Sequence, residues 1–250
     1  MSLTDHHCHL LPAIDDGAAS LEESLLMARL LVDAGFSQVY CTPHCIPGCF
    51  DTTARQVEKA VNALQKELAA AGIDLELQPG MEYYLDEHFP EQLEAPRPLG
   101  ETGLLLVEAP SQAPPELIME NIVQIQRKGL TPLFAHPERC GWLAAPDPEN
   151  GLWAKAKGIF TQNSESGTQN PSHLFDLRTM GCLFQANLGS FAGFYGSRVR
   201  TLARELKIAG SYHCYGSDGH GTAQLERVLQ TDELTEIKIH HNPDPKGKPT

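Results

Sequence analysis

The stretch TDHHCHLLPAIDDGA, from Thr4 to Ala18, holds three histidines, three aspartates and one cysteine within fifteen residues. Alternate residues of a β-strand point to the same face, so a strand here places His7 and His9 on one side and His6 on the other. Asp16 falls in the loop that follows. Imidazoles and carboxylates are metal ligands, so this density predicts that the first strand forms one wall of a polar site.

The rest of the chain alternates apolar, strand-like runs with helical stretches. A capping-box pattern, Ser20 with Glu23, precedes the first helical stretch. Alternating strands and helices predict a parallel sheet, either doubly wound or closed into a barrel, and 250 residues is a common length for an α/β barrel. The predicted helices span residues 21–32, 52–71, 115–128 and 197–208, with a short one near 225. The predicted later strands are SQVYCTP, DLELQPGMEYY, LLLVEA, TPLFAHP, CLFQANL and YHCYGSD.

Composition narrows the classes of function. A formal net charge of −13 disfavours nucleic acid and anionic membrane surfaces as partners, because both require clustered Lys and Arg. The seven cysteines are irregularly spaced, and no signal-peptide pattern or apolar run of about 18 residues is visible. We therefore expect a cytoplasmic protein with reduced thiols and no membrane insertion.

No linker or internal repeat divides the chain. We expect a single domain over residues 1–240, with an insertion at 143–180 and a loose tail at 241–250. The segment GIFTQNS, residues 158–164, reads either as an eighth strand or as part of the insertion.

Ligand-type side chains recur where the predicted strands end. In a parallel barrel these C-terminal ends converge on one mouth, which is the usual active site. A single histidine at such a position is usually structural, but nine ionisable residues at equivalent positions favour a metal site. The nine are His7, His9, Asp16, His44, Glu82, Glu108, His136, Asp218 and His220.

Charge supports the same interpretation. Four carboxylates in one mouth repel each other and are costly to bury without cations, and Arg139 is the clearest cation nearby in sequence. Five imidazoles and four carboxylates suit divalent Mn, Fe or Zn, and nine ligands exceed the needs of one ion. We therefore expect two or three divalent ions. Three such ions would turn a charge of −4 into +2, and a site of that charge could hold a phosphate.

These motifs also carry a family resemblance. In order along the chain, DHHCHLLPAIDDGA, CTPH, GMEYY, LLLVEA, AHPER, GCLFQANLGSFAGFYG and GSDGH resemble the PHP (polymerase and histidinol phosphatase) superfamily. Within it, they are most similar to the bacterial manganese-dependent tyrosine-protein phosphatases of capsular and exopolysaccharide operons. The resemblance implies a distorted (β/α)7, TIM-like barrel with a trinuclear site, and it favours Mn among the candidate ions. It assigns the same nine residues as metal ligands and Arg139 to phosphate binding, and it places GIFTQNS in the insertion.

The implied function is hydrolysis of phosphotyrosine on protein, regulating polysaccharide biosynthesis or export, with a bacterial tyrosine kinase as partner. The hypothesis for mechanism is direct attack by a metal-activated hydroxide, with Arg139, Asp218 and His220 taking part in catalysis. The general acid is either His220 or a metal-bound water. Asp5 and Asp15 are candidates for orienting ligands, and Phe191, Phe194 and Tyr195 for flanking an aromatic substrate or packing at the rim.

The chain departs from the family pattern at four places, one of which is the region from Trp142 to Gly181, which looks longer than usual. His6 stands where the family usually has a hydrophobic residue, and Cys140 follows Arg139 where the family often has tyrosine. After His220 the family commonly supplies an arginine that helps to bind phosphate, whereas here Arg227, on a predicted helix, is the only arginine left. The last departure bears on phosphotyrosine preference rather than on the metal ligands.

Alternative functions remain open at this stage. One is a PHP phosphatase for a small metabolite such as histidinol phosphate, and another is a non-catalytic metal-binding module. The segment CFDTTAR, Cys49 to Arg55, matches the C-x5-R spacing of cysteine-dependent tyrosine phosphatases, but it lacks a glycine that would let the backbone wrap a phosphate. Cys41, Cys45 and Cys49 are four residues apart, but Pro43 and Pro47 interrupt any helix, which favours incidental thiols.

Overall fold

The structure, a computed structural model, describes residues 3–141, 143, 173–231 and 233–235. The expected tail at 241–250, the segment GIFTQNS and most of the expected insertion at 143–180 lie outside these residues. The end of that expected insertion forms helix α6 (His173–Thr179). In the described part of the chain, no helix is long and apolar enough to cross a membrane.

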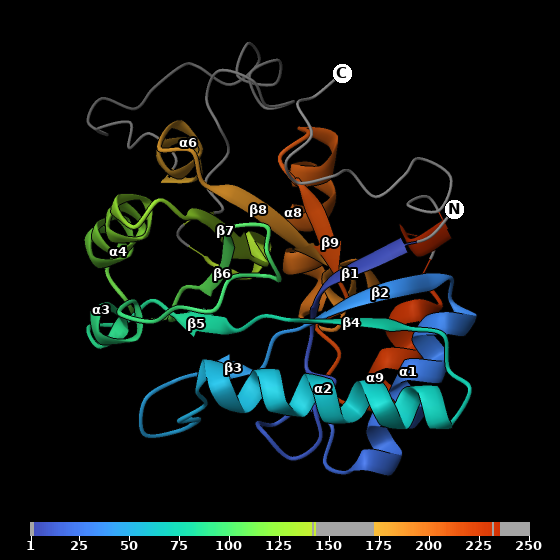
Figure 1. Ribbon diagram of the computed structural model, residues 1–250. Coiled ribbons are helices and arrows are strands. Elements are labelled where there is room, and N and C mark those ends of the chain that lie inside the picture. Colours follow the sequence, from blue (N-terminus) through green and yellow to red (C-terminus); the bar gives the residue numbers. More distant parts are fainter. Residues whose placement is uncertain (1–2, 142, 144–172, 232, 236–250) are drawn as a thin grey trace, which may run out of the picture.

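The strands form a closed parallel ring (Figure 1). One sheet has the order β1 (Leu3–Cys8), β2 (Phe36–Cys41), β4 (Glu76–Pro79). The other has the order β3 (His44–Cys45), β5 (Glu82–Tyr84), β6 (Leu104–Glu108), β7 (Thr131–Ala135), β8 (Leu183–Asn187), β9 (Cys214–Gly216). β1 and β9 close the ring, because the Asp218 amide donates to the His7 carbonyl at 2.7 Å and the His9 amide to the Gly219 carbonyl at 3.0 Å.

Two barrel strands are interrupted. β2 continues as β3 after Thr42 and Pro43, and β4 continues as β5 after Gly80 and Met81. Pro43 has no amide to donate to the ladder, which accounts for the first break. At the second break, the Gly80 amide donates to the Cys41 carbonyl at 2.9 Å, and a Cβ on Gly80 would lie 2.6 Å from Leu99 Cδ2. With each pair counted as one strand, the described residues form seven barrel strands. The predicted distorted (β/α)7 barrel is therefore confirmed.

The predicted helices form close to their expected bounds. They are α1 (Leu21–Asp33), α2 (Ala54–Ala70), α4 (Pro115–Arg127), α8 (Gly196–Ile208) and α9 (Thr222–Leu229). Ser20 caps α1 by accepting from the Glu23 amide, as its sequence pattern predicts. α2 begins later than predicted because Thr53 is its N-cap in a capping box with Gln56. The sequence reading missed the short helices α3 (Phe89–Gln92) and α7 (Leu188–Ala192), and the 3-10 turn η1 (Pro137–Arg139).

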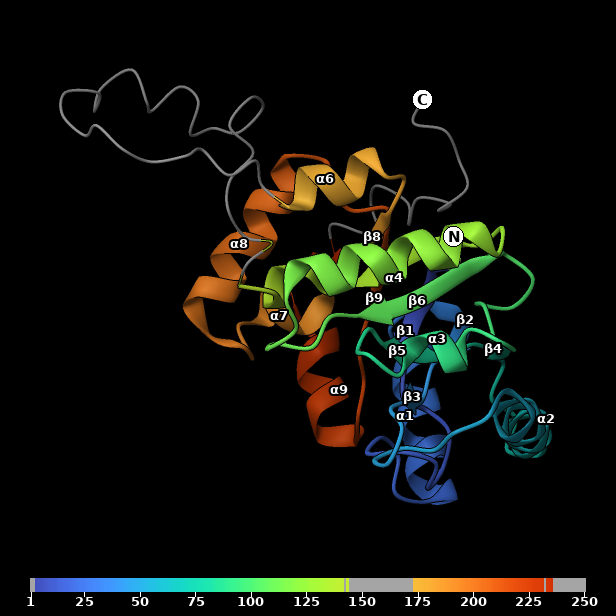
Figure 2. The ribbon, with the colours of Figure 1, turned by 90° about the vertical axis from the view of Figure 1, so that its left-hand side faces the viewer.

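The helices cover the outside of the barrel (Figures 1 and 2). On the outer face, Leu105, Val107 and Phe134 belong to the same buried cluster as Ile118 and Ile122 of α4. On β6, Leu104 and Leu106 alternate with these and share a face with Glu108. They belong to a second buried cluster, with Leu133, Ala135 and Cys214. This apolar layer lies below the strand-end carboxylate, so the polar site sits on a packed floor.

Candidate metal centre

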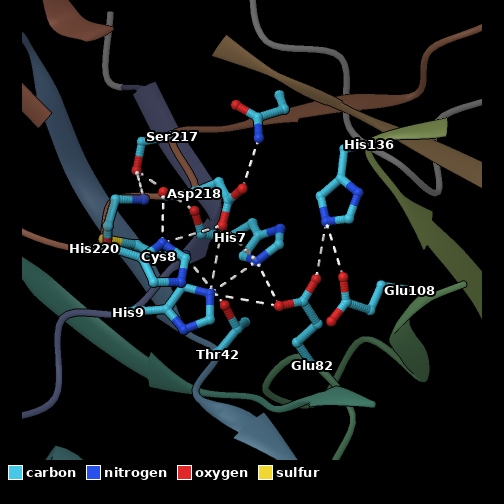
Figure 3. A network of polar contacts seen from close by, with 12 residues as sticks. His7, Cys8, His9, Thr42, Glu82, Glu108, His136, Ser217, Asp218 and His220 are labelled. Carbon is cyan, nitrogen blue, oxygen red and sulfur yellow. Dashed lines mark hydrogen bonds and ion pairs between the residues drawn. The ribbon is translucent and has the colours of Figure 1, made fainter. Parts of the chain in front are cut away.

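The strand ends bring the nine predicted ligand residues together at one mouth. Figure 3 shows most of them, namely His7, His9, Glu82, Glu108, His136, Asp218 and His220. Side-chain atoms that can bind a metal gather in three groups, within each of which they lie no more than 4.8 Å apart. The groups are His9, Asp16, His44 and His220; His7, His9, Glu82 and Asp218; and His44, Glu82 and Glu108. His136 belongs to none of them, but its Nε2 lies 3.1 Å from Glu82 Oε1 and 3.7 Å from Glu108 Oε2.

Parallel pairing explains why residues far apart in sequence meet here. His44 is directly opposite Glu82 in the β3–β5 register, and Glu108 is opposite Tyr84 in the β5–β6 register. The two interrupted strands therefore deliver His44 and Glu82 side by side. His44 Nδ1 lies 3.1 Å from Glu82 Oε2.

Two site residues have left-handed backbone conformations. His136 has φ 35° and Asp218 has φ 51°, whereas left-handed φ is uncommon for residues other than glycine. Hydrogen bonds to neighbouring strands hold both conformations. The His136 amide donates to the Gln185 carbonyl at 3.0 Å, and the Asp218 amide donates to the His7 carbonyl at 2.7 Å. Such conformations cost about 1–3 kcal/mol each and cluster at functional sites. Here they turn each chain at the strand end, so that both side chains reach the mouth.

The centre of the site contains facing nitrogens and oxygens. His7 Nε2 and His9 Nε2 lie 3.1 Å apart, and both face Glu82 Oε2, at 3.1 and 3.5 Å, and Asp218 Oδ1, at 3.3 and 3.5 Å. Two imidazole nitrogens at this distance need a cation between or beside them, either a proton or a metal ion. All four side chains are buried. The donor set and its spacing therefore fit divalent ions of the Mn, Fe or Zn class.

The pKa values of the ligand residues also indicate that this cluster of carboxylates needs cations. Burial would lower the pKa of His7, but Glu82 and Asp218 beside it raise that pKa to about 9. Burial, reinforced by the charge of Glu82, raises the pKa of Glu108 to about 8. Burial and nearby Arg139 lower the pKa of His136 to about 4. Protons therefore partly neutralise the crowded carboxylates, which is a role that divalent ions can take over.

Partners outside the centre orient two of the histidine rings. Asp15 Oδ2 lies 2.6 Å from His9 Nδ1 and also accepts from the His44 amide at 2.9 Å. Gln185 Oε1 lies 3.0 Å from His7 Nδ1. Each contact engages Nδ1 and leaves Nε2 facing the centre, the usual arrangement around metal-binding histidines. The geometry supports the expectation for Asp15, whereas the sequence reading missed Gln185, whose only signal was its place near the end of CLFQANL.

Asp5 and His6 lie behind the ligands. Asp5 Oδ1 accepts from the amides of His7 and Ser217, at 3.1 and 2.9 Å, so it ties β1 to the end of β9 rather than orienting a ring. His6 stacks on Tyr40 with ring centroids 5.5 Å apart and belongs to none of the three groups, as expected.

Asp218 links the ligand groups to a second set of residues. Its Oδ2 accepts from Arg139 Nη1 at 2.9 Å, from Asn187 Nδ2 at 2.6 Å and from the Tyr195 hydroxyl at 3.3 Å. The Arg139 guanidinium also lies over the Tyr195 ring, 4.5 Å from its centroid. Burial and the neighbouring histidines shift the pKa of Asp218 in opposite directions, and the histidines hold it well below its usual range. Asn187 was not singled out from the sequence.

The other two aromatic candidates, Phe191 and Phe194, lie in different surroundings. Phe191 is buried in a cluster with Ala186 and Ala203, so it packs the core instead of lining the mouth. Phe194 lies under the Arg227 guanidinium, which is 4.3 Å from its ring centroid. Arg227 therefore stacks on the residue next to Tyr195.

The cysteine motifs do not form a site. In the described part of the chain, no group of potential metal ligands includes a cysteine. Cys41 and Cys45 are buried, and burial raises the pKa of the Cys45 thiol to about 11. In the CFDTTAR segment, the Cys49 and Phe50 amides both donate to the Ile46 carbonyl, so they form a turn instead of a phosphate cradle.

Comparison with known proteins agrees with this geometry. The family model for capsular polysaccharide synthesis, CpsB/CapC, matches residues 3–150. The chain is 30% identical over 220 residues to the tyrosine-protein phosphatase YwqE of Bacillus subtilis, covering 87% of this chain and 77% of that protein. It is 27% identical over 139 residues to the tyrosine-protein phosphatase CpsB of Streptococcus agalactiae, covering 55% of this chain and 57% of that protein.

A solved structure extends the similarity over nearly the whole fold. It comes from a crystallographic study of YwqE from Bacillus subtilis and CpsB from Streptococcus pneumoniae, described as unique metal-dependent tyrosine phosphatases. The TM-score is 0.72 at 28% sequence identity, and the match covers 95% of this chain and 92% of the other.

Proposed function

Because the chain belongs to the CpsB/CapC family of capsular polysaccharide synthesis, we propose that it is a metal-dependent phosphatase acting on phosphotyrosine in proteins. The observation that carries this proposal is the convergence of nine histidine, aspartate and glutamate residues on one mouth. A lapsed enzyme would be under no constraint to keep all nine. The intact set therefore weighs against a non-catalytic metal-binding module.

The nine ligand residues would hold two or three divalent ions, with manganese favoured. Bound there, the ions would supply Lewis acidity and positive charge for a phosphoryl group and its attacking water. The proposed ligands are His7, His9, Asp16, His44, Glu82, Glu108, His136, Asp218 and His220.

Arg139 is the proposed phosphate-binding residue of the chain itself. Its side chain is 34% exposed at the mouth, whereas its ion-pair partner Asp218 is buried. The Asp218 carboxylate and the Tyr195 ring together hold the guanidinium in place. A held guanidinium can donate to two phosphate oxygens and stabilise the charge that develops on them.

His220 is better placed as a ligand than as an acid. Its Nδ1 lies 3.0 Å from the Asp218 backbone carbonyl, which can only accept, so Nδ1 carries the proton. Nε2 then presents a lone pair to the group that includes Asp16. A tyrosine leaving group, with a pKa near 10, needs less protonation than an alkoxide, so the reaction does not require a strong acid here.

The biological setting follows from the family. We propose that the substrate is a phosphotyrosine protein whose phosphorylation regulates polysaccharide biosynthesis or export, and that a bacterial tyrosine kinase is one such partner. A cytoplasmic location fits the seven cysteines, all of which are free.

The decisive experiment measures turnover by protein stripped of metal and reloaded with manganese. A phosphotyrosine peptide and histidinol phosphate serve as parallel substrates. We expect manganese-dependent phosphate release from the peptide, lost in His136→Ala and kept in Cys49→Ser. Preference for histidinol phosphate would favour a small-metabolite phosphatase. Full metal binding without turnover on either substrate would favour the binding module.

A further inference from the structure

A cavity separate from the metal centre lies beside helices α7 and α8. These two helices pack against each other (Figure 2). The volume of the cavity is about 640 Å³. Phe191 of α7, Arg200, Arg204, Lys207 and Ile208 of α8, and Glu233 line it. None of these residues belongs to the ligand groups at the mouth.

The cavity wall is cationic in a strongly acidic protein. Arg200, Arg204 and Lys207 follow one another at intervals of four and three residues, so they share one face of α8. The helix has four cations, Arg198 being the fourth, and one acid, Glu205, whereas the whole chain has 19 Lys and Arg against 32 Asp and Glu. Like charges four residues apart destabilise a helix in the absence of a neutralising partner.

Within the described part of the chain, only one of the three cations on this wall has an acidic partner. Lys207 forms an ion pair with Glu233. Arg200 and Arg204 are exposed, and neither has an ion-pair partner among the residues that the structure describes. Two positive charges on this wall are therefore available to an external anion.

The wall also has an apolar part. Ile208 is 69% exposed and is one of the few large hydrophobic side chains that the described surface presents. Phe191, almost fully buried, contributes from the other side. A combination of cations and apolar surface fits a peptide that carries both acidic and apolar residues better than it fits a small inorganic anion.

Helix α8 connects the cavity with the metal centre. It starts at Gly196, next to Tyr195, whose hydroxyl contacts Asp218. At 1.5 Å per residue, Arg200 and Arg204 lie about 6 and 12 Å along the helix from this start. An extended peptide advances about 3.3 Å per residue, so residues about two to four positions from a phosphotyrosine bound beside Tyr195 and Arg139 reach this wall.

We propose that this cavity binds an acidic segment of the phosphoprotein substrate, about two to four residues from the phosphotyrosine. The proposal rests on the proposed phosphotyrosine phosphatase function. A chain of net charge −13 repels an acidic substrate except where local cations outweigh that charge. The cations of α8 would provide such a local positive surface.

The test pairs two substrates with two variants. One phosphotyrosine peptide has Asp and Glu at about two to four positions from the phosphotyrosine, and the other has Asn and Gln there. Arg200→Gln/Arg204→Gln removes the two available charges. Arg198→Gln is the matched control, because Arg198 is exposed on the same helix but does not line the cavity.

We expect the double variant to raise KM for the acidic peptide by about three- to tenfold with kcat unchanged, as for the loss of two exposed ion pairs. KM for the neutral peptide and turnover of p-nitrophenyl phosphate stay at wild-type values, and Arg198→Gln has no effect. An equal change for both peptides, or no change for the acidic one, would overturn the proposal.

A binding measurement separates this proposal from the phosphatase function. Fluorescence anisotropy with the acidic peptide, labelled and lacking phosphate, is compared between wild type and the double variant. Weaker binding by the double variant supports the cavity assignment even if no phosphotyrosine peptide is hydrolysed. Equal binding by both proteins, or binding to phosphatidylglycerol vesicles in place of the peptide, contradicts it.

Discussion

Arg139 and Asp218, 79 positions apart in sequence, form an ion pair across the mouth of the barrel, with Nη1 and Oδ2 2.9 Å apart. The other oxygen of the same carboxylate, Oδ1, faces His7 and His9. One aspartate therefore couples the candidate metal ligands to the candidate phosphate-binding residue. Changes on either side are expected to affect the other.

Replacing the cation tests the phosphate side of this pair. We expect Arg139→Gln to lower kcat/KM for a phosphotyrosine peptide by about 10²-fold, because a donor aimed at the developing charge is lost. Arg139→Lys should recover little, since an ammonium cannot donate in the same bidentate fashion. Steady-state kinetics measure the loss. Metal content by mass spectrometry is the control, and a variant that lost its metal would show that Arg139 acts through the ligands instead.

Glu82 is the carboxylate at the centre of the ligand set, facing His7, His9, His44 and His136. We expect Glu82→Gln to reduce bound metal and to lower kcat/KM by more than about 10²-fold, exceeding the usual effect of an outer partner. Glu101→Gln is the matched control, because Glu101 is 95% exposed. Metal content and activity at wild-type levels in Glu82→Gln would remove Glu82 from the ligand set.

Replacing Asp15 tests whether its carboxylate orients the His9 ring. Its Oδ2 lies 2.6 Å from His9 Nδ1, so Asp15→Asn should leave His9 in place but weaken its basicity. The expected result is metal affinity lower by about 10- to 100-fold, measured by competition with a chelator. Asp33→Asn, at an exposed position at the end of α1, should leave affinity unchanged. Equal affinities for the two variants would contradict the orienting role.

Packing against His7 gives a steric prediction. A Cβ at Gly216 would lie 2.5 Å from His7 Cβ and 2.8 Å from Gln185 Nε2, too close for either to remain in position. Gly216→Ala is therefore expected to displace the His7 ring and to lower bound metal and activity together. Gly141→Ala, where a Cβ would meet nothing within 4 Å, is the control. Unchanged metal content in Gly216→Ala would mean that the site tolerates a shifted His7.

Metal removal should destabilise the fold. Four carboxylates and five imidazoles are crowded at the mouth, and ligands that bind only the folded state stabilise it by about 2.7 kcal/mol at a concentration of 100 Kd. For a chain of this size we expect Tm to fall by about 5–10 °C after chelation and to recover with manganese. Differential scanning fluorimetry measures the shift. A Tm insensitive to both treatments would argue against metal binding at this site.

Local sequence patterns contain most of the fold and the ligand set. Capping residues such as Ser20 mark a helix start, and apolar runs such as LLLVEA mark buried strands, because both depend on neighbours in the chain. The ligand residues could be found because parallel strands end at a common mouth, so position along each unit implies a common location.

The tertiary structure alone decides which side chains touch. Gln185 contacts His7 and Asn187 contacts Asp218 because strand register around the ring brings them together. Their place near the end of CLFQANL puts both residues near the mouth but does not predict which side chains they contact. The left-handed turns at His136 and Asp218 are held by hydrogen bonds from other strands. The cationic cavity likewise needs α7, α8 and the segment after α9 to pack together. Such contacts arise from long-range packing, whereas the sequence pattern carries only local periodicity and residue type.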